Sequence, residues 1–400
     1  MRTVGSAHAD VIVVGAGIVG LGIAWALAES GRSVCVVDPH PAQGATYAAA
    51  GMLAAVSELH YQEDDLLRLM LSSAALYPRF IESLPGGAAA TGYQTTETLV
   101  VGSDSGDRQA LADLHTVQQR HGLDVVPLSV REARQREQLL SPQLSCAFVV
   151  ADDHQVDPRM LAAHLLAELG AMPGGQTSVV RATARGVIHE DEGDLDSRVI
   201  GVDLDDGTRL LAQEVIVANG LGAARLAGLP GSLALPLRPV YGDILRLRVP
   251  DNLRTLLSAT VRGLVRGVPV YLVPRADGTL VIGATSREDS LLGVSAGGMY
   301  QLLRDAQALV PAVAELELLE TTARARPATP DNAPLLGRVA SAQGDMIPGL
   351  VVATGFYRHG VLLTPIAADI CRRIIEGEDV PDAHCFRPDR FSSPLRKELS

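Results

Sequence analysis

The segment from Asp10 to Asp38 constrains the fold of this chain most strongly. It opens with an apolar run over residues 11–14, which is typical of a buried strand. Three glycines at the spacing G-x-G-x-x-G follow directly, and an apolar helical segment continues from them: Gly15, Gly17 and Gly20. A second apolar run, 33–37, ends on the acid Asp38, about 20 residues past the glycines. This order of elements predicts a dinucleotide-binding βαβ unit.

Each residue type in this unit has a physical reason. Gly15 permits the tight turn, and Gly17 lets the backbone approach a pyrophosphate because no Cβ stands in the way. Gly20 lets the helix pack closely against the strand. The free N–H groups and the positive dipole end at the start of the helix attract phosphates. Asp38 can accept hydrogen bonds from ribose hydroxyls, which favours an adenosine without a 2′-phosphate.

A membrane span or a signal-peptide core is the alternative interpretation, because residues 11–28 are uncharged and mostly apolar. The residues before this stretch carry one Arg and one Asp, and glycines crowd its first half. Cleavage after Ala28 would also remove the glycine loop and leave Asp38 without a purpose. We therefore favour nucleotide binding and expect no membrane span and a cytoplasmic location.

Charge and cysteine usage exclude several further classes. A formal net charge of −12 without a basic tract argues against nucleic-acid binding. The four cysteines are scattered, with no C-x-x-C pair and no histidine cluster: Cys35, Cys146, Cys371 and Cys385. This pattern favours neither a zinc site nor a disulfide framework, so we expect no metal and a reducing cytoplasm.

A chain of 400 residues is expected to form two domains. A late strand–glycine–helix unit (350–353, Gly355, 360–375) indicates that both ends of the chain build one nucleotide domain. Between them, alternating strands over 240–247, 270–274 and 280–282 indicate an antiparallel sheet. The predicted fold class is α/β plus α+β, a Rossmann-like domain with an inserted antiparallel-sheet substrate domain.

The predicted nucleotide domain comprises residues 1–85, 150–228 and 324–385, and the substrate domain comprises 86–149 and 229–323. The remaining patterns predict helices over 64–81, 108–121, 157–169 and 295–310, a β-meander over 179–188, 198–204 and 209–211, and strands over 93–102 and 214–220.

Several segments together resemble a known family. They are the glycine fingerprint, A-A-A-G-M-L at 48–53, Y-L-V-P-R at 271–275, I-G-A-T at 282–285, R-P-A-T-P-D at 326–331 and A-T-G-F-Y-R-H-G-V-L-L at 353–363. In this order they are similar to the FAD-dependent D-amino-acid oxidase/sarcosine oxidase family over essentially the whole chain, and most closely to its glycine oxidase branch, which is linked to thiamine biosynthesis.

The resemblance implies FAD as the cofactor and assigns its contacts. The pyrophosphate would contact Gly15, Gly17, Ile18, Val19 and Gly20, the ribose would contact Asp38 and Pro39, and the adenine would contact Ala184. The residues at the flavin end would be Ala45, Thr46, Ala50, Gly51 and Met52. The flavin ring would contact Gly355, Phe356, Tyr357, Arg358, His359, Gly360, Val361 and Leu362. Some relatives attach FAD through a cysteine before the T-P-D motif. Arg324 occupies that position here, so noncovalent FAD is expected.

The same resemblance implies three substrate residues. Arg326 matches the carboxylate clamp, Tyr271 matches a second donor to that carboxylate, and Arg358 matches an arginine close to the reacting centre. A planar guanidinium fits this role because two parallel hydrogen bonds fix the orientation of a carboxylate.

The expected reaction is oxidative deamination of glycine, sarcosine or a small D-amino acid. Its product is an imine, which hydrolyses to a keto acid (glyoxylate from glycine) and ammonia, or which supplies thiazole formation. Only one dinucleotide fingerprint is present, which favours O2 as electron acceptor and H2O2 as product over reductase chemistry. Ser286 and Pro269 depart from relatives near the substrate and leave the preferred amine open.

Other functions stay open at this point. The first alternative is a D-amino-acid dehydrogenase that uses an acceptor other than O2. A flavin-binding scaffold without catalysis would lack the pair Arg326 and Tyr271, and a nicotinamide dehydrogenase would leave the motif at 355–360 without a role. By resemblance we also expect a homo-oligomer, a tetramer.

Overall fold

The computed structural model describes residues 8–253, 256–341 and 343–392. The chain divides into two compact units. The first consists of Met1–Tyr47, Ala162–Pro239 and Arg326–Ser400, and the second of Ala48–Leu161 and Val240–Ala325. Within the described ranges, no helix is both long and apolar enough to cross a bilayer.

An eight-stranded sheet forms the centre of the first unit, in the order β17-β18-β11-β1-β2-β8, with β10 pairing with β11 and β9 with β10. The strands are β1 (His8–Val14), β2 (Val34–Val37), β8 (Thr177–Val180), β9 (Ala184–His189), β10 (Val199–Leu204), β11 (Arg209–Val217), β17 (Leu335–Ala340) and β18 (Met346–Thr354). β1 pairs in parallel with β2 and with β11, as a doubly wound sheet requires. The predicted Rossmann-like architecture is confirmed.

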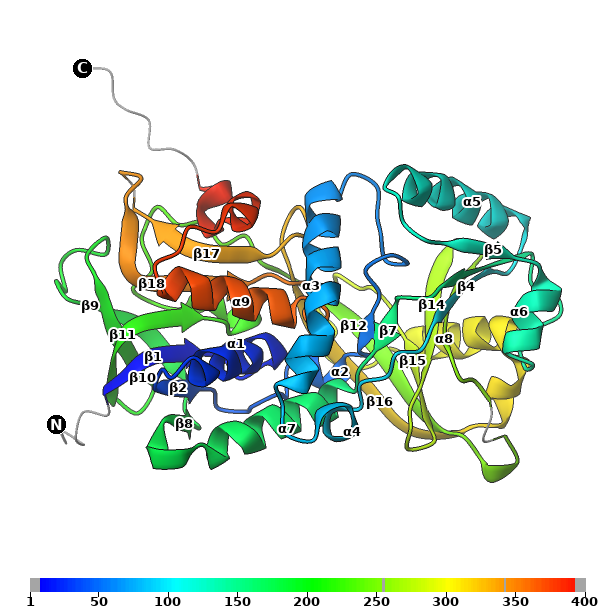
Figure 1. Cartoon of the computed structure of the whole chain (residues 1–400), viewed down its shortest axis with the longest axis horizontal. Coiled ribbons are helices and arrows are strands. Elements are labelled where there is room, and N and C mark those ends of the chain that lie inside the picture. The colour runs from blue at the N-terminus through cyan, green and yellow to red at the C-terminus, as the bar shows by residue number, and fades with distance from the viewer. Residues whose placement is uncertain (1–7, 254–255, 342, 393–400) are drawn as a thin grey trace, which may run out of the picture. The chain divides into compact units, whose positions relative to one another are not determined.

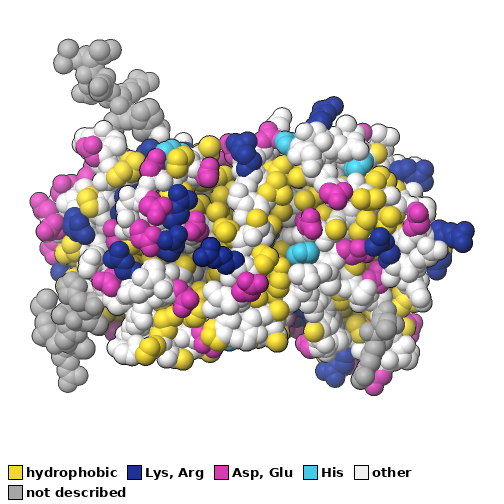
Figure 2. Space-filling model, in the orientation of Figure 1, with side chains coloured by type: hydrophobic (Ala, Val, Ile, Leu, Met, Phe, Trp, Pro, Cys, Tyr) yellow, Lys and Arg dark blue, Asp and Glu magenta, His cyan; other side chains and the backbone are white. Residues whose placement is uncertain are grey.

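Two helices, α1 (Ile18–Glu29) and α9 (Thr364–Ile375), pack against each other in this unit (Figure 1). α1 is buried along almost its whole length, and residues 11–14 of the strand before it are buried as well. This burial explains why residues 11–28 are as apolar as a membrane span. By contrast, α9 carries ion pairs of Arg372 with Asp369 and Glu376, and Figure 2 shows acidic and basic side chains interspersed there.

The predicted β-meander differs from the observed strands. Residues 179–188 were expected to form one strand, but β8 ends at Val180, where it pairs in parallel with β2, and β9 begins at Ala184 to pair with β10. Residues 209–211 and 214–220 were expected to form two strands, but β11 is continuous. Its first half pairs with β10 and its second half with β18, so a single strand serves two neighbours.

A second eight-stranded sheet forms the other unit, in the order β16-β12-β15-β14-β13-β4-β6-β5. The strands are β4 (Thr98–Gly102), β5 (Val126–Leu128), β6 (Cys146–Val150), β12 (Arg238–Arg248), β13 (Thr260–Val265), β14 (Val268–Pro274), β15 (Thr279–Gly283) and β16 (Glu317–Ala328). β12, β15, β14 and β13 pair in antiparallel fashion, which confirms the predicted sheet.

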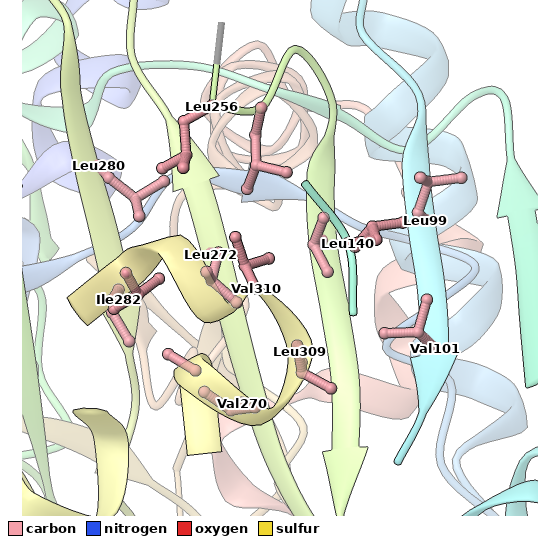
Figure 3. Close-up of a cluster of buried hydrophobic side chains, with 14 of the residues drawn as sticks. Leu99, Val101, Leu140, Leu256, Val270, Leu272, Leu280, Ile282, Leu309 and Val310 are labelled. Atoms are coloured by element: carbon pink, nitrogen blue, oxygen red, sulfur yellow. The ribbon is translucent and has the colours of Figure 1, made fainter. Parts of the chain in front are cut away.

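The core of the second unit is a cluster of Leu, Val and Ile side chains. Figure 3 shows side chains of β4, β14 and β15 pointing toward Leu309 and Val310, at the end of helix α8 (Ala296–Leu309). Burying side chains of this size contributes about 1.5–3 kcal/mol each relative to exposure. The long helices of the chain begin and end within a few residues of their predicted bounds: α3 (Asp64–Glu82), α5 (Ser105–Arg120), α7 (Pro158–Ala171) and α8.

Short elements complete the chain. They are α2 (Ala45–Ala48), β3 (Met52–Leu53), α4 (Gly87–Thr91), α6 (Val130–Arg136), β7 (His154–Gln155) and the 3-10 turns η1 (Pro173–Gly175), η2 (Gly220–Arg225), η3 (Asp251–Leu253), η4 (Pro311–Glu315), η5 (Pro381–Phe386) and η6 (Pro388–Phe391). The predicted strand 93–102 begins only at Thr98; Gln94 forms an isolated bridge to Gln155.

The bounds of the units differ from the predicted domain boundaries. Residues 48–85 and 150–161 belong to the second unit, although we assigned them to the nucleotide domain. The physical reason is local pairing: β3 pairs with β7, and Val156 N–H donates to Gly51 O at 2.9 Å. The assignment of FAD to one unit and substrate to the other stays a prediction.

We expect an acid-dependent contribution to stability from Glu320. Arg159 donates to both of its carboxylate oxygens at 2.8 and 2.9 Å and lowers the pKa of Glu320 to about 2. Because the pKa is lowered in the folded state, the stabilisation is complete above the ordinary value of 4.5 and is lost as pH falls toward 2.

Above pH 4.5 the variant Glu320→Gln should therefore have a free energy of unfolding about 1–2 kcal/mol below that of the wild type, after solvent screening is allowed for. It should accordingly unfold at a lower temperature. The difference should shrink as pH falls, measured by circular dichroism. Glu317→Gln on the same strand is the control, because Glu317 and its partner Arg248 are largely exposed. A difference that does not change with pH would contradict the assignment.

Candidate functional site

The glycines after β1 build a cradle in the first unit. Gly15 has φ +106°, and a Cβ on it would lie 2.6 Å from Ala218 O. A Cβ on Gly20 would lie 2.0 Å from Gly15 O, so α1 can approach β1 only with glycine there. A Cβ on Gly17 would meet only Thr46 Oγ1, at 3.6 Å. The fingerprint thus contains two glycines that the protein's own backbone requires and one that borders open space.

The first turn of α1 is prepared for an anion. Its N-cap is Gly17, which has no capping side chain, and its first turn has no acidic residue. Ile18 N–H donates to Thr46 Oγ1 at 2.9 Å, which ties α2 to the start of α1. The remaining N–H groups and the helix dipole favour a negative ligand such as a pyrophosphate.

Asp38 follows β2 and is held in place by the backbone. Its carboxylate accepts from Ala16 N–H at 2.7 Å and from His40 N–H at 2.8 Å. Its own N–H donates to Val180 O at 3.0 Å. Val180 therefore lies beside Asp38, at the end of β8. Ala184 lies on β9, opposite Leu204, and its contact with the adenine stays a prediction.

The segment 355–362 forms a tight turn before α9. Gly355 has φ +75°, and a Cβ there would lie 2.7 Å from Thr329 Cγ2. Tyr357 also has a positive φ, 47°, and its N–H donates to Pro327 O at 2.9 Å. This bond brings the turn beside the end of β16, which carries Arg326. We expected the helix to begin at Gly360, but it begins at Thr364.

Guanidinium groups surround the ring of Tyr357. The Cζ of Arg358 lies 4.9 Å from the ring centroid, and that of Arg238 lies 5.9 Å from it. Arg238 also donates to Asn332 Oδ1 at 3.1 Å. Arg358 Nε is buried and has no hydrogen-bond partner within the described part of the chain. A sequence motif marks Arg358, whereas no motif marks Arg238.

In the second unit, Tyr271 lies on β14 in a small apolar cluster. It packs with buried Ala50 and Ile244 and with half-buried Met52. Its neighbour on β15 is Gly283, and a Cβ there would lie 2.3 Å from the Tyr271 hydroxyl. The absence of a side chain at Gly283 therefore leaves room for the Tyr271 ring.

The loop between α2 and β3 is held by a buried arginine. Arg275 donates to Val156 O at 2.9 Å, to Gln155 Oε1 at 3.1 Å and to Ala50 O. Gly51 has φ +74°, and a Cβ on it would lie 2.0 Å from Val156 O. Arg275 is the last residue of the Y-L-V-P-R segment, but its place in that segment does not predict this role.

The structure thus brings the predicted residues together in three groups. In the first unit, one group lies around the start of α1: Gly15, Gly17, Ile18, Asp38 and Thr46. The second is the pair Tyr357 and Arg358, which a hydrogen bond to Pro327 O holds next to Arg326 in the chain. In the second unit, Ala50 and Met52 lie with Tyr271. Among the described residues, no group of three or more His, Cys, Asp or Glu side chains could hold a metal ion.

These residues fit a dinucleotide. The cradle has glycines where a Cβ could not be placed, a helix start whose N-cap is a glycine, and an anchored acid after the second strand. Asn219, directly beside Gly15, has a buried Oδ1 without a hydrogen-bond partner within the described residues, which leaves an acceptor for a ligand.

Comparison with known proteins identifies the dinucleotide that this chain binds. Residues 10–373 match the family described as FAD dependent oxidoreductase (DAO). The chain belongs to this family. It is therefore an FAD-dependent oxidoreductase, and the FAD expected from the motifs is its cofactor.

Relatives within this family are similar to the chain over most of its length. The chain is 31% identical to glycine oxidase of Geobacillus kaustophilus, over 92% of this chain and 93% of that protein. It is 30% identical to the putative thiamine biosynthesis oxidoreductase ThiO of Rhizobium etli, over 93% of this chain and 98% of that protein. The crystal structure of the Geobacillus kaustophilus glycine oxidase matches with a TM-score of 0.84, over 96% of this chain and 99% of that chain, at 29% identity.

Other curated relatives are longer. The chain spans about half the length of the bifunctional ThiO/ThiG proteins that it matches, 55% in the case of Trichormus variabilis.

We expect Gly20→Ala to destabilise the first unit, because the added methyl group would collide with a backbone oxygen that cannot move without shifting β1. The loss should be at least about 2–3 kcal/mol, measured by thermal unfolding of the FAD-bound protein. Gly170→Ala is the matched control. Gly170 lies in α7 with nothing near its Cβ position, so alanine should be neutral or stabilise by about 0.5–1 kcal/mol. Equal midpoints for both variants would refute the packing argument.

We expect Asp38→Ala to weaken FAD binding by about ten- to a hundredfold, the effect of losing a hydrogen bond to a charged group. Titration of the apoprotein with FAD measures the Kd. The control is Asp10→Ala at the opposite end of β1, where the carboxylate accepts from Ser33 N–H at 2.8 Å. If both variants bind FAD equally well, Asp38 does not contact the ribose.

Proposed function

We propose that this oxidoreductase oxidises glycine, and also sarcosine or small D-amino acids, to the imine. The observation that carries the proposal is the position of Arg326 on β16, one residue before Pro327, whose carbonyl anchors the Tyr357–Arg358 turn. Two guanidinium groups from separate elements thereby stand in one region of the first unit. The similarity to a glycine oxidase over more than nine-tenths of both chains supports the proposal.

The proposed roles follow from the chemistry of the side chains. Arg326 binds the substrate carboxylate with two parallel hydrogen bonds, which fixes both position and orientation. The Tyr271 hydroxyl donates to the same carboxylate, and Arg358 adds positive charge. When bound, FAD supplies a two-electron acceptor for the hydride of the substrate Cα. A neutral amine is required because its lone pair assists hydride loss.

The proposed products depend on water and on the electron acceptor. Hydrolysis of the imine from glycine gives glyoxylate and ammonia. We propose O2 as the acceptor, with H2O2 as product, because the chain has a single dinucleotide fingerprint. The alternative, a D-amino-acid dehydrogenase with another acceptor, shares every step up to reduction of the flavin. Only reoxidation separates the two.

Further parts of the proposal rest on the resemblance. FAD is bound noncovalently, because Arg324 stands at the position of the attaching cysteine. The imine supplies thiazole formation in thiamine biosynthesis, which the name of the Rhizobium relative supports. We also propose a cytoplasmic homo-oligomer, a tetramer.

The test is anaerobic mixing of the purified, FAD-loaded protein with glycine, sarcosine and D-alanine, followed by O2. Loss of the flavin visible absorbance with glycine, and its rapid return with formation of H2O2, is the expected result. Bleaching without return in O2 would support the dehydrogenase. A flavin that none of the three amines bleaches would refute the proposed substrates.

We expect Arg326→Met to raise the KM for glycine by about ten- to a hundredfold, with Arg326→Lys in between, because lysine cannot form two parallel hydrogen bonds. Binding of acetate, followed through the flavin spectrum, should weaken by a similar factor. Methylamine, which lacks the carboxylate, should react equally slowly with wild type and variant. Arg248→Met is the control, since Arg248 is largely exposed. Unchanged binding of acetate to Arg326→Met would exclude the clamp.

A further inference from the structure

We propose that Arg275 is a positioning residue, which sets the orientation of the peptide between Ala50 and Gly51 so that the loop can receive the flavin. The proposal deepens the proposed function, since it rests on the predicted contact of Ala50, Gly51 and Met52 with the flavin end of FAD. It concerns contacts that all lie within the second unit.

The guanidinium of Arg275 reaches three acceptors in different directions. One nitrogen, Nη1, donates to Val156 O at 2.9 Å and to Gln155 Oε1 at 3.1 Å, and the other, Nη2, donates to Ala50 O. Arg275, the residue directly after β14, therefore links the end of this strand to the short strand β7 and to the loop that leads into β3. Only the planar fork of an arginine can serve acceptors in this arrangement.

The bond to Ala50 O fixes more than one atom. The peptide between Ala50 and Gly51 is trans, because the cis bond of the described chain is Gly283–Ala284. In a trans peptide the C=O and N–H vectors point in opposite directions. A carbonyl held by Arg275 therefore turns the N–H of Gly51 away from Arg275, as a donor for a ligand.

The loop has little freedom to compensate for a lost anchor. Gly51 has φ +74°, and its Cβ position would lie 2.0 Å from Val156 O, the same oxygen that accepts from Arg275. Val156 N–H in turn donates to Gly51 O at 2.9 Å. The backbones of loop and β7 are thus in direct contact, and Arg275 binds both of them.

Burial indicates that this arginine is retained for position and not for stability. The residue is only 9% exposed, and the carboxylate of Asp157 lies 3.7 Å from its Nε. A buried guanidinium without close ion pairing costs free energy. Burial lowers the pKa of Arg275 to about 10, so it still carries its charge at neutral pH. A second buried arginine, Arg246, donates to the carbonyl of Ala49, the residue before Ala50, at 3.5 Å.

The experiment compares Arg275→Lys and Arg275→Met with the wild type by titrating each apoprotein with FAD. We expect the Kd of FAD to rise by about tenfold or more in Arg275→Met, with partial rescue by lysine, which keeps charge and one hydrogen bond. The shape of the visible absorption band of bound flavin should change as well, since it reports the environment of the ring and not the stability of the fold.

Arg338→Lys is the matched control. Arg338 also donates to a carboxylate and to a backbone carbonyl, those of Glu214 and Ile374, but Glu214 pairs with Val11 in the middle of β1, before the glycine turn. We expect this control to change the Kd of FAD by no more than about twofold. Gln155→Met, which removes a single acceptor, gives a milder test should Arg275→Met fail to fold.

The proposal is overturned if Arg275→Lys and Gln155→Met bind FAD with wild-type Kd and spectrum. It is also overturned if their Kd rises only in parallel with a loss of thermal stability of the apoprotein that Arg338→Lys shows too. These outcomes do not depend on substrate. A wild-type protein that binds FAD but does not oxidise glycine would refute the proposed substrate and leave the role of Arg275 intact.

Discussion

Close contact between the backbone of β1 and the first turn of α1 is the constraint on which the first unit depends. At Gly20 a single methyl group would overlap Gly15 O, and at Gly15 it would overlap the backbone after β11. The start of α1 is therefore fixed against the carboxyl ends of two parallel strands. That position places the N–H groups of its first turn near Asp38, which accepts from Ala16 N–H, and near Thr46, which accepts from Ile18 N–H. Anion binding here is a consequence of how the sheet and helix must pack.

The second unit solves a different problem, since it must hold an irregular loop beside an antiparallel sheet. The carbonyl groups of an irregular loop lack the regular N–H donors of a neighbouring strand, so side chains have to donate hydrogen bonds to some of them. Arg275, the residue after β14, supplies several donors, and its bond to Ala50 O ties the loop to the end of a strand. The two units thus use opposite means: glycines admit close backbone approach in one, and a long buried side chain spans a gap in the other.

The sequence predicted the fold class, the order of the main elements and the residues of the glycine cradle, because these depend on local patterns. The apolar runs of β1 and β2 and the spacing of Gly15, Gly17 and Gly20 are readable within 30 residues. Strand β16, which carries Arg326, was missed. Its first residues, Glu317 to Leu319, are exposed at the edge of a sheet, so they lack the alternation that marks a half-buried strand.

Contacts between distant segments explain the remaining differences. Nothing near Arg275 in the sequence reveals that its partners are Ala50 and Val156, more than a hundred residues away. Likewise, Val180 lies beside Asp38 only because β8 adds to β2 at the edge of the sheet, while Ala184 begins a hairpin with a different neighbour. A motif identifies which residues are special, whereas tertiary pairing decides which backbone atoms they meet. Donors such as Arg238 and Arg275, which act on the backbone of other segments, are therefore the residues that sequence patterns reveal last.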